Sequence, residues 1–269
     1  MEVGLHNKFY IYLLFLIFST NVYAVEFKGD FKQGSFILGK ASPDTKVFID
    51  NRNIRVSKEG YFAFGLDRDR KNDVIINIQK DGETKKIIKK IFKRKYKIQR
   101  IDGLPPKQVT PPPEVYERIK KDNILIGKAR SVDTAFDFFK NKFIYPIDKY
   151  IITGVYGRQR ILNGKPRRPH YGIDFHAPEG TPVKAMMDGE VTLAEIDMYF
   201  TGGTIIFDHG HGISTLFMHM KDIDVKVGQK VKQGQIVGTL GQSGRATGPH
   251  LDIRLNWFDV KLDPATILN

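Results

Sequence analysis

The sequence predicts a mainly β protein in which a small β-sandwich domain and a proline-rich, partly helical linker precede a larger antiparallel β domain. Short apolar segments alternate with Gly, Asp and Asn turns along most of the chain. One stretch of helical composition follows a run of prolines, and no long amphipathic helix interrupts the carboxy-terminal part. With 269 residues, 41% of them apolar, the chain can bury a core over one or two domains, which excludes disorder throughout.

Residues 1–24 have the pattern of a secretory signal peptide. Lys8 precedes an uninterrupted apolar run over residues 9–18, and Ala24 ends a segment suited to cleavage. An uncleaved anchor is the alternative, but a membrane-spanning helix needs about 20 apolar residues, and no later segment approaches that length. We therefore expect cleavage after Ala24 and a secreted or periplasmic protein with no transmembrane segment.

Residues 25–100 are expected to form the β-sandwich. The expected strands, which Gly, Asp and Asn turns separate, are 35–38, 46–49, 61–64 and 73–78. The stretch 85–100 then carries nine Lys or Arg in sixteen residues. It fits a solvated edge strand whose lysines prevent edge-to-edge pairing, or a surface that attracts an anionic polymer.

Residues 101–143 are expected to be a linker. Prolines at 105–106 and 111–113 stiffen it, and residues 114–130 have helical composition, with acids early and bases late as the helix dipole favours. Residues 144–269 are expected to form the larger β domain. Gly180 and Gly228 open two related strand pairs, which suggests a folded-over sandwich or barrel with two similar halves.

Cysteine is absent, which excludes disulfides, cysteine-ligated zinc, iron–sulfur clusters and thiol nucleophiles. Any metal must therefore be held by His, Asp, Glu or water. The net charge of +13 favours an anionic partner such as nucleic acid, a membrane surface or a cell-wall polymer. Residues 25–150 carry 29 Lys+Arg against 17 Asp+Glu, whereas residues 151–269 carry 13 against 12. The charge therefore indicates wall or membrane-surface attachment by the first part of the chain.

Six of the seven histidines lie after residue 169. His170 and Asp174 are four residues apart, and Gly172 disfavours a helix between them, so we expect a strand that presents both side chains on one face. His219 ends an apolar segment of strand length.

A strict alternation follows near the end of the chain. His250, Asp252 and Arg254 are expected on one face of a strand, and their apolar neighbours on the other. Imidazole and carboxylate groups without cysteine match the chemistry of catalytic zinc sites, in which three protein ligands leave one position open. Histidines beside such a site can move a proton or stabilise an oxyanion.

Five motifs, in order, resemble those of the lysostaphin-type (LytM-like) zinc metallopeptidases over residues 150–265. They are HYGID from His170, APEGTPV from Ala177, DHGHG from Asp208, FMH ending at His219 and GRATGPHL ending at Leu251. The resemblance implies a compact antiparallel β catalytic domain with a long groove, which binds one zinc ion and cuts peptide bonds in peptidoglycan.

By matching positions, the resemblance implies that His170, Asp174 and Asp252 bind the metal and that His219 and His250 are catalytic. Asp252 departs from the family pattern, because the second histidine of an H-x-H motif is usual at that position. Tyrosine is likewise usual where the sequence has phenylalanine, two residues before His219.

Asp252 has two interpretations. A carboxylate oxygen is an acceptable zinc ligand, so the three residues can still form a site, although two carboxylates reduce its formal charge from +1 to zero. Alternatively, Asp252 pairs with Arg254 on the same face, and the metal is weak or absent. We expect the metal-bearing form, because every other catalytic position is filled.

Other polar side chains near these motifs have less specific interpretations. Further histidines are expected in turns, or in positions that orient the metal ligands; they are His176, His209 and His211. Arginines near His170 are expected to bind substrate carboxylates or to be solvated; they are Arg158, Arg160, Arg167 and Arg168.

These inferences favour an exported zinc endopeptidase that hydrolyses the peptide crosslinks of bacterial peptidoglycan by metal-activated water. The main alternative is a catalytically disabled LytM-like regulator that activates a cell-wall amidase, with a cell-wall or divisome protein as its partner. A lipoyl or biotinyl carrier, suggested by Lys184 between Gly-rich strands, leaves the His/Asp motifs unexplained and conflicts with export. Export, a single Trp and the lack of a stacking motif disfavour nucleic-acid binding.

Overall fold

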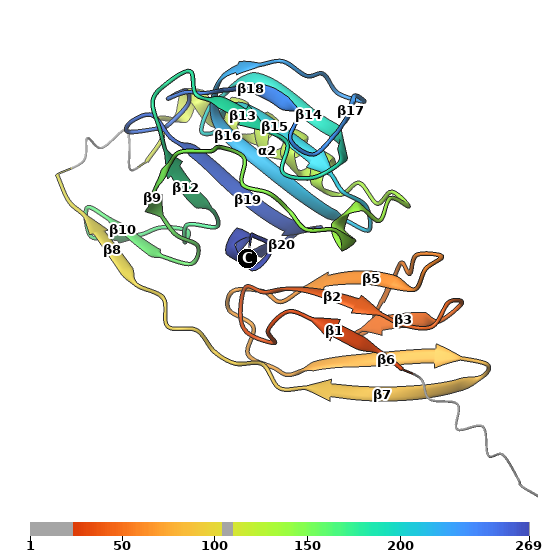
Figure 1. The fold of residues 1–269 in the computed structure, drawn as a ribbon. Coiled ribbons are helices and arrows are strands. Elements are labelled where there is room, and N and C mark those ends of the chain that lie inside the picture. Colours follow the sequence, from red (N-terminus) through yellow and green to blue (C-terminus); the bar gives the residue numbers. More distant parts are fainter. Residues whose placement is uncertain (1–23, 104–109, 269) are drawn as a thin grey trace, which may run out of the picture.

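The computed structural model describes residues 24–103 and 110–268 of the chain. The predicted signal peptide lies outside the described residues except for its last position, as does part of the predicted linker. Within the described part, the fold is mainly antiparallel β with one α-helix, which confirms the predicted fold class. None of the described helices is long and apolar enough to span a bilayer. Figure 1 shows two β bodies, one built from the amino-terminal strands and one from the carboxy-terminal strands.

The amino-terminal strands form two small antiparallel sheets. The first has the order β1-β2-β5, with strands Glu26–Lys28, Phe36–Lys40 and Tyr61–Gly65. The second has the order β4-β3-β6-β7, with strands Arg52–Ile54, Lys46–Ile49, Val74–Lys80 and Glu83–Lys89. Alternate residues of β6 are fully buried because their side chains point to one face of the sheet. Apolar residues of both sheets belong to one buried cluster, so the two sheets share a core.

The basic stretch 85–100 divides between two environments. Its first residues lie on β7, an edge strand with mostly exposed side chains, as the edge-strand interpretation predicts. The chain then leaves this sheet, and β8 (Ile98–Ile101) pairs in parallel with β10 (Gln159–Leu162). The antiparallel hairpin of β10 and β11 (Lys165–Pro166) completes a third small sheet. The second half of the basic stretch therefore joins the two bodies instead of extending the edge.

The carboxy-terminal body is built on one large sheet that has ten strands among the described residues. Its main path is β17 (Lys230–Val231), β14 (Gly189–Met198), β15 (Gly202–Asp208), β16 (Ile213–Ile223), β19 (Leu251–Trp257), β12 (Ile173–His176) and β9 (Ile151–Gly154). Off this path lie β13 (Pro182–Lys184), β18 (Ile236–Leu240) and β20 (Val260–Leu262). Short 3-10 turns occur at Pro113–Val115 (η1), Phe138–Lys140 (η2) and Pro264–Thr266 (η3).

Helix α2 (Tyr116–Arg130) packs on this sheet and begins within two residues of the predicted start. Ala129 near its end lies in a buried cluster with Leu193 of β14, Ile206 of β15, and Leu216 and Met218 of β16. Alternation along β16 places Leu216 and Met218 on the same face. The helix therefore covers the sheet face on which Met218 lies.

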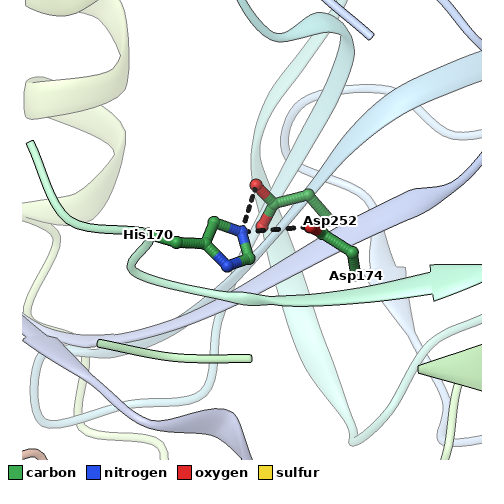
Figure 2. Close-up of side chains that lie close together, drawn as sticks. All are labelled: His170, Asp174 and Asp252. Atoms are coloured by element: carbon green, nitrogen blue, oxygen red, sulfur yellow. Dashed lines mark hydrogen bonds and ion pairs between the residues drawn. The ribbon is translucent and has the colours of Figure 1, made fainter. Parts of the chain in front are cut away.

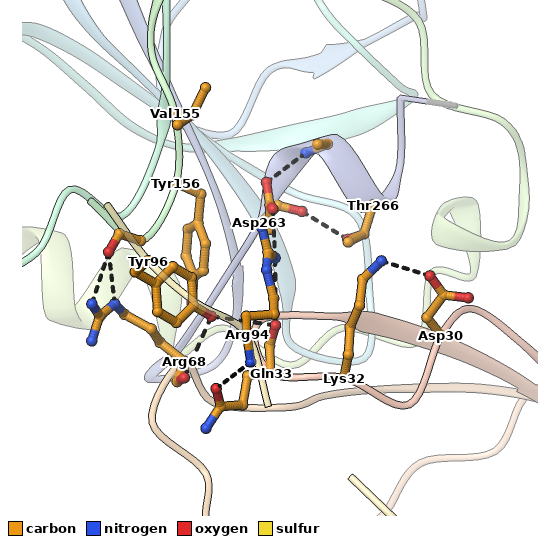
Figure 3. Close-up of polar contacts among 12 residues, drawn as sticks. Asp30, Lys32, Gln33, Arg68, Arg94, Tyr96, Val155, Tyr156, Asp263 and Thr266 are labelled. Carbon is orange, nitrogen blue, oxygen red and sulfur yellow. Dashed lines mark hydrogen bonds and ion pairs between the residues drawn. The ribbon is translucent and has the colours of Figure 1, made fainter. Parts of the chain in front are cut away.

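The two β bodies contact each other through specific groups. Gly65 of β5 approaches Leu262 so closely that a Cβ would lie 2.5 Å from Leu262 Cδ2. Arg94 from the basic stretch donates to Asp263 at 2.7 Å, and buried Arg68 donates twice to the Gly157 carbonyl at 2.8 and 3.1 Å (Figure 3). Apolar contact and buried charge thus fix the amino-terminal sheets against the carboxy-terminal body.

Candidate metal centre and active site

Asp174 and Asp252 are direct cross-strand partners on β12 and β19. Side chains at such positions lie on the same face, with Cβ atoms about 4.5–5.5 Å apart. His170 approaches them from the loop before β12, because the strand begins only at Ile173. The expected strand through residues 170–172 is therefore wrong. The backbone of His170 instead exchanges hydrogen bonds with the turn at 157–158, which takes it out of the ladder.

The three side chains meet at one imidazole nitrogen, as Figure 2 shows. His170 Nε2 lies 3.0 Å from Asp174 Oδ1 and 3.3 Å from Asp252 Oδ2. Its other ring nitrogen, Nδ1, lies 3.3 Å from the carbonyl oxygen of Val155, which only an N–H can satisfy. This contact turns Nε2 toward the carboxylates, in the way that an outer-shell carbonyl orients a metal-binding histidine.

The charges of this triad are strongly coupled. Burial alone would lower the pKa of His170, but its contacts with Asp174 and Asp252 raise that pKa to about 9. Burial would likewise raise the pKa of Asp252, but Arg254 and His170 hold it well below its ordinary value. The cluster therefore favours a positive charge between the carboxylates, where a proton on Nε2 or a metal cation can supply it.

The donor set fits a metal ion. One nitrogen and two carboxylate oxygens from the three buried side chains lie within 4.8 Å of one another. Imidazole nitrogen and carboxylate oxygen are both zinc ligands. Asp174 Oδ1 is buried, and no donor among the described residues reaches it with hydrogen-bond geometry. A buried acceptor without a donor destabilises the folded state unless a cation or a water molecule binds to it.

Two glycines make room for the carboxylates. A Cβ on Gly154 would lie 2.0 Å from Asp174 Oδ2, and a Cβ on Gly172 would lie 2.2 Å from Asp252 Oδ1. Both distances are far below van der Waals contact. In the sequence, Gly172 argues only against a helix and Gly154 gives no signal, because the close approaches exist only after β9, β12 and β19 pair.

Asp252 makes a contact that matches each of its two interpretations. Its Oδ2 faces His170, as a ligand atom would, and also accepts from Arg254 Nη2 at 3.0 Å. Arg254 Nε lies 3.4 Å from Oδ1, so the guanidinium spans both carboxylate oxygens. The ion pair with Arg254 therefore leaves Asp252 Oδ2 facing His170 Nε2.

The two candidate catalytic histidines lie beside the triad. Register pairs Met218 of β16 with Asp252, so His219 is one residue beyond this pair, and His250 immediately precedes β19. The two imidazole rings have centroids 4.7 Å apart. His219 has a φ of +65°, a left-handed conformation that is uncommon for residues other than Gly and is often found at functional sites. Pairing therefore places His219 and His250 next to the Met218–Asp252 pair, with their rings close to each other.

Within the described part of the chain, each ring contacts a backbone carbonyl through Nδ1 and none through Nε2. His219 Nδ1 lies 2.8 Å from the Ser243 carbonyl, and His250 Nδ1 lies 2.8 Å from the Gly248 carbonyl. A carbonyl accepts, so each Nδ1 carries the hydrogen and each neutral ring keeps a lone pair on Nε2. Burial lowers the pKa of His219, which favours this neutral form near pH 7. The pair can therefore accept and return protons.

The remaining polar candidates separate by distance from the triad. His176 Nδ1 donates to the carbonyl of Pro249 at 2.7 Å and so fixes the residue before His250. His209 is buried away from the triad, between the Asp188 carbonyl and Thr215. His211 has a positive φ in the turn between β15 and β16, which agrees with the turn position expected for it.

Only one of the arginines that flank His170 forms an ion pair with the triad. Arg160 Nη2 lies 3.9 Å from Asp174 Oδ2. Arg158 and Arg167 donate elsewhere, to the Thr153 carbonyl and to the Thr110 hydroxyl.

Comparison with known proteins places the site in a family. Residues 168–264, which include all five candidate residues, match peptidase family M23. This segment of the chain is therefore an M23 peptidase domain, in agreement with the resemblance to the LytM-like metallopeptidases.

Particular relatives can be named. Peptidoglycan DD-endopeptidase ShyA of Vibrio cholerae is 40% identical over 113 residues, which cover 41% of this chain and 26% of that protein. DD-carboxypeptidase/endopeptidase Mpg of Neisseria meningitidis is 38% identical over 91 residues, which cover 33% of this chain and 21% of that protein. The chain thus spans about a quarter of the length of these relatives. A crystal structure assigned to peptidase M23 from Pseudomonas aeruginosa has a TM-score of 0.68 at 24% identity, covers 89% of this chain and 95% of its own, and shares the fold.

Proposed function

We propose that the protein is an exported zinc-dependent endopeptidase that hydrolyses the peptide crosslinks of bacterial peptidoglycan. The observation that carries this proposal is the placement of the His170, Asp174 and Asp252 cluster beside His219 and His250 within an M23 domain. Relatives named as peptidoglycan endopeptidases support the choice of substrate. The signal-peptide pattern of residues 1–24 supports export.

His170, Asp174 and Asp252 would hold the zinc ion. Bound there, zinc would supply Lewis acidity toward the oxygen of a scissile peptide carbonyl. The protein contributes the position of the ion, the orientation of each ligand and a largely buried surrounding, in which charges interact more strongly than in water. Val155 and Arg254 keep His170 and Asp252 in place through the contacts described above.

The two histidines would move the protons. A neutral His219 or His250 can take a proton on Nε2 from the attacking water and return it to the leaving amine nitrogen. Whichever ring is protonated can also donate from Nε2 to the developing oxyanion. The carbonyls of Ser243 and Gly248 keep each Nδ1 protonated and so hold the tautomer that this exchange needs.

The direct test is hydrolysis of purified crosslinked muropeptides by the zinc-loaded chain, followed by chromatography. We expect conversion of dimers to monomers, a loss of at least about 100-fold in rate for His219→Ala, and no change for His209→Gln as a buried control. Intact dimers with the wild type, or full activity of His219→Ala, would overturn the proposal.

A regulator without catalysis is the second candidate, and the ion pair between Asp252 and Arg254 is the observation that favours it. In that case the domain would bind a cell-wall or divisome protein, such as an amidase, and would need no metal. Elemental analysis of the purified chain separates the two. About one zinc per chain supports the peptidase, and less than a tenth of that supports the regulator.

A further inference from the structure

Two arginines contact the candidate metal centre and two more interact with them, although the carboxy-terminal part of the chain is nearly neutral as a whole. They are Arg160, Arg167, Arg245 and Arg254, and they come from the β10-β11 hairpin, the loop after β18 and β19. Arg160 contacts the carboxylate of Asp174, and Arg254 contacts that of Asp252. A divalent cation at the triad would add two further positive charges.

Arg160 and Arg167 are direct neighbours across the hairpin. Ile161 pairs with Pro166, and the next residues outward are joined by a hydrogen bond from Arg167 N to Arg160 O at 2.9 Å. Like charges at directly opposite positions are destabilising in antiparallel pairs. The arrangement is therefore costly for stability by itself, and an anion between the two guanidinium groups would relieve it.

The polar groups of these two side chains are incompletely satisfied. The Nε atoms of both Arg160 and Arg167 are buried and have no hydrogen-bond partner among the described residues. Arg160 is 3.9 Å from Asp174 Oδ2, which is too long for a strong hydrogen bond, and Arg167 reaches only the hydroxyl of Thr110. Buried donors without partners mark a place where a ligand atom can complete the set.

Arg245 extends the cluster on another side. Its guanidinium carbon lies 4.4 Å from the ring centroid of Phe200, which holds the side chain by stacking. Desolvation, and next the positive charge of Arg160, lower the pKa of Arg245, with smaller contributions from Arg167 and Arg254. The charges of Arg160, Arg167 and Arg254 therefore all act on the guanidinium group of Arg245.

We propose that Arg160, Arg167 and Arg245 form a subsite for a free carboxylate of the peptide substrate, next to the bond that is cut. Guanidinium binds carboxylate through two parallel hydrogen bonds, and lysine does not reproduce this geometry. Because Arg160 is 3.9 Å from a candidate metal ligand, the carboxylate lies within about one or two residues of the scissile carbonyl, given about 3.8 Å between Cα atoms. This inference rests on the proposed function and names its substrate class: stem peptides that carry an unblocked carboxylate near the cleavage point.

The test compares a crosslinked muropeptide with the same molecule after its carboxylates are converted to primary amides. Binding of each form to the zinc-loaded His219→Ala chain is measured by calorimetry, and hydrolysis by the zinc-loaded wild type is measured separately. We expect amidation to weaken binding roughly 10- to 100-fold, the range of hydrogen bonds to charged groups. When Arg160→Gln and Arg167→Gln are introduced into the His219→Ala chain, the difference in affinity between the carboxylate and amide forms should fall to about twofold.

Matched variants keep the result interpretable. Arg168→Gln removes an exposed arginine of the same segment and should retain the full discrimination. Replacing Arg160 and Arg167 by lysine preserves charge and folding, but this variant should retain only part of the discrimination between the two forms. Equal binding of the two forms, no measurable binding of either, or unchanged discrimination in the glutamine or lysine variants would overturn the subsite. Hydrolysis of both forms at equal rates would overturn the subsite and leave the peptidase proposal intact. Binding that favours the carboxylate form, without hydrolysis of either form, would overturn the peptidase proposal and leave the subsite intact.

Discussion

Asp252 Oδ2 accepts a hydrogen bond from Arg254 Nη2 at 3.0 Å, and the same oxygen lies 3.3 Å from His170 Nε2. The arginine and the imidazole thus approach the same oxygen of a candidate metal ligand. Two carboxylates cancel the charge of a zinc ion, and the guanidinium restores one positive charge to the group. A site with one carboxylate and two histidines has this same formal charge, so Arg254 offsets the exchange of histidine for Asp252.

Removing that positive charge should change metal binding in a defined direction. Arg254→Gln eliminates repulsion of the cation, and zinc affinity should rise roughly tenfold, while activity falls by a similar factor because the site becomes a weaker Lewis acid. Arg254→Lys keeps the charge and should remain within about threefold of the wild type in affinity. Competition with a chelator measures both. Weaker zinc binding by Arg254→Gln would mean that the arginine acts mainly by orienting Asp252.

Asp252 itself should be required for the metal. Loss of an outer-shell partner costs about 10–100-fold in metal affinity, so loss of a direct ligand in Asp252→Asn should cost at least about 100-fold. Elemental analysis after dialysis measures the remaining zinc. Asp197→Asn, an exposed carboxylate paired with Arg118, is the control and should keep its zinc. Full zinc content in Asp252→Asn would remove Asp252 from the ligand set.

Gly172 should be required for a reason of space. A Cβ at this position would lie 2.2 Å from Asp252 Oδ1, so Gly172→Ala must displace the carboxylate, and zinc affinity should fall by at least about tenfold. Gly127→Ala on helix α2 is the matched control, because its Cβ would have no neighbour within 4 Å. That control should keep zinc and gain up to about 1 kcal/mol of stability. Equal zinc content in the two variants would contradict the close approach.

His209 should make the fold sensitive to acid. Burial lowers its pKa to about 4, below the value of about 6.5 in an unfolded chain. Between these values the unfolded state binds a proton that the folded state excludes, so stability is complete above pH 6.5 and falls as the pH drops toward 4. Between pH 7.5 and 5, the wild type should lose about 1–2 kcal/mol more than His209→Gln in urea unfolding. Identical losses would show that another group causes the acid sensitivity.

The basic amino-terminal part should bind the wall by charge. Residues 25–150 carry 29 Lys+Arg against 17 Asp+Glu, and exposed lysines follow β7. Binding of the full chain to purified sacculi should therefore fall several-fold between about 50 and 300 mM salt. Sacculus binding at low salt should weaken when glutamine replaces Lys86, Lys90 and Lys93. It should not change in the control variant with Lys226→Gln and Lys230→Gln. Binding that is independent of salt would refute this attachment.

The sequence by itself determined which residues are candidates for the site and the local form of most strands. Alternation around Ile253 and the order of the His and Asp motifs were enough to predict a mainly β fold and to select the five candidate residues. These are local properties, because a period of two decides which side chains share a face of one strand. Three of the residues selected from the motifs, His170, Asp174 and Asp252, form one cluster in the structure.

Only the tertiary structure decided how these residues meet. His170 reaches the carboxylates from a loop and not from the expected strand, since its backbone bonds to residues 157–158. Arg254 donates a hydrogen bond to Asp252 while His170 approaches the same oxygen. Gly154, which has no side chain, leaves room for the Asp174 carboxylate. Apart from the Arg254–Asp252 ion pair, which is local to β19, these relationships join separate segments of the chain, so they depend on the pairing of β9, β12 and β19. Local sequence restricts which face a side chain takes, but register and loop path set the distances on which metal binding depends.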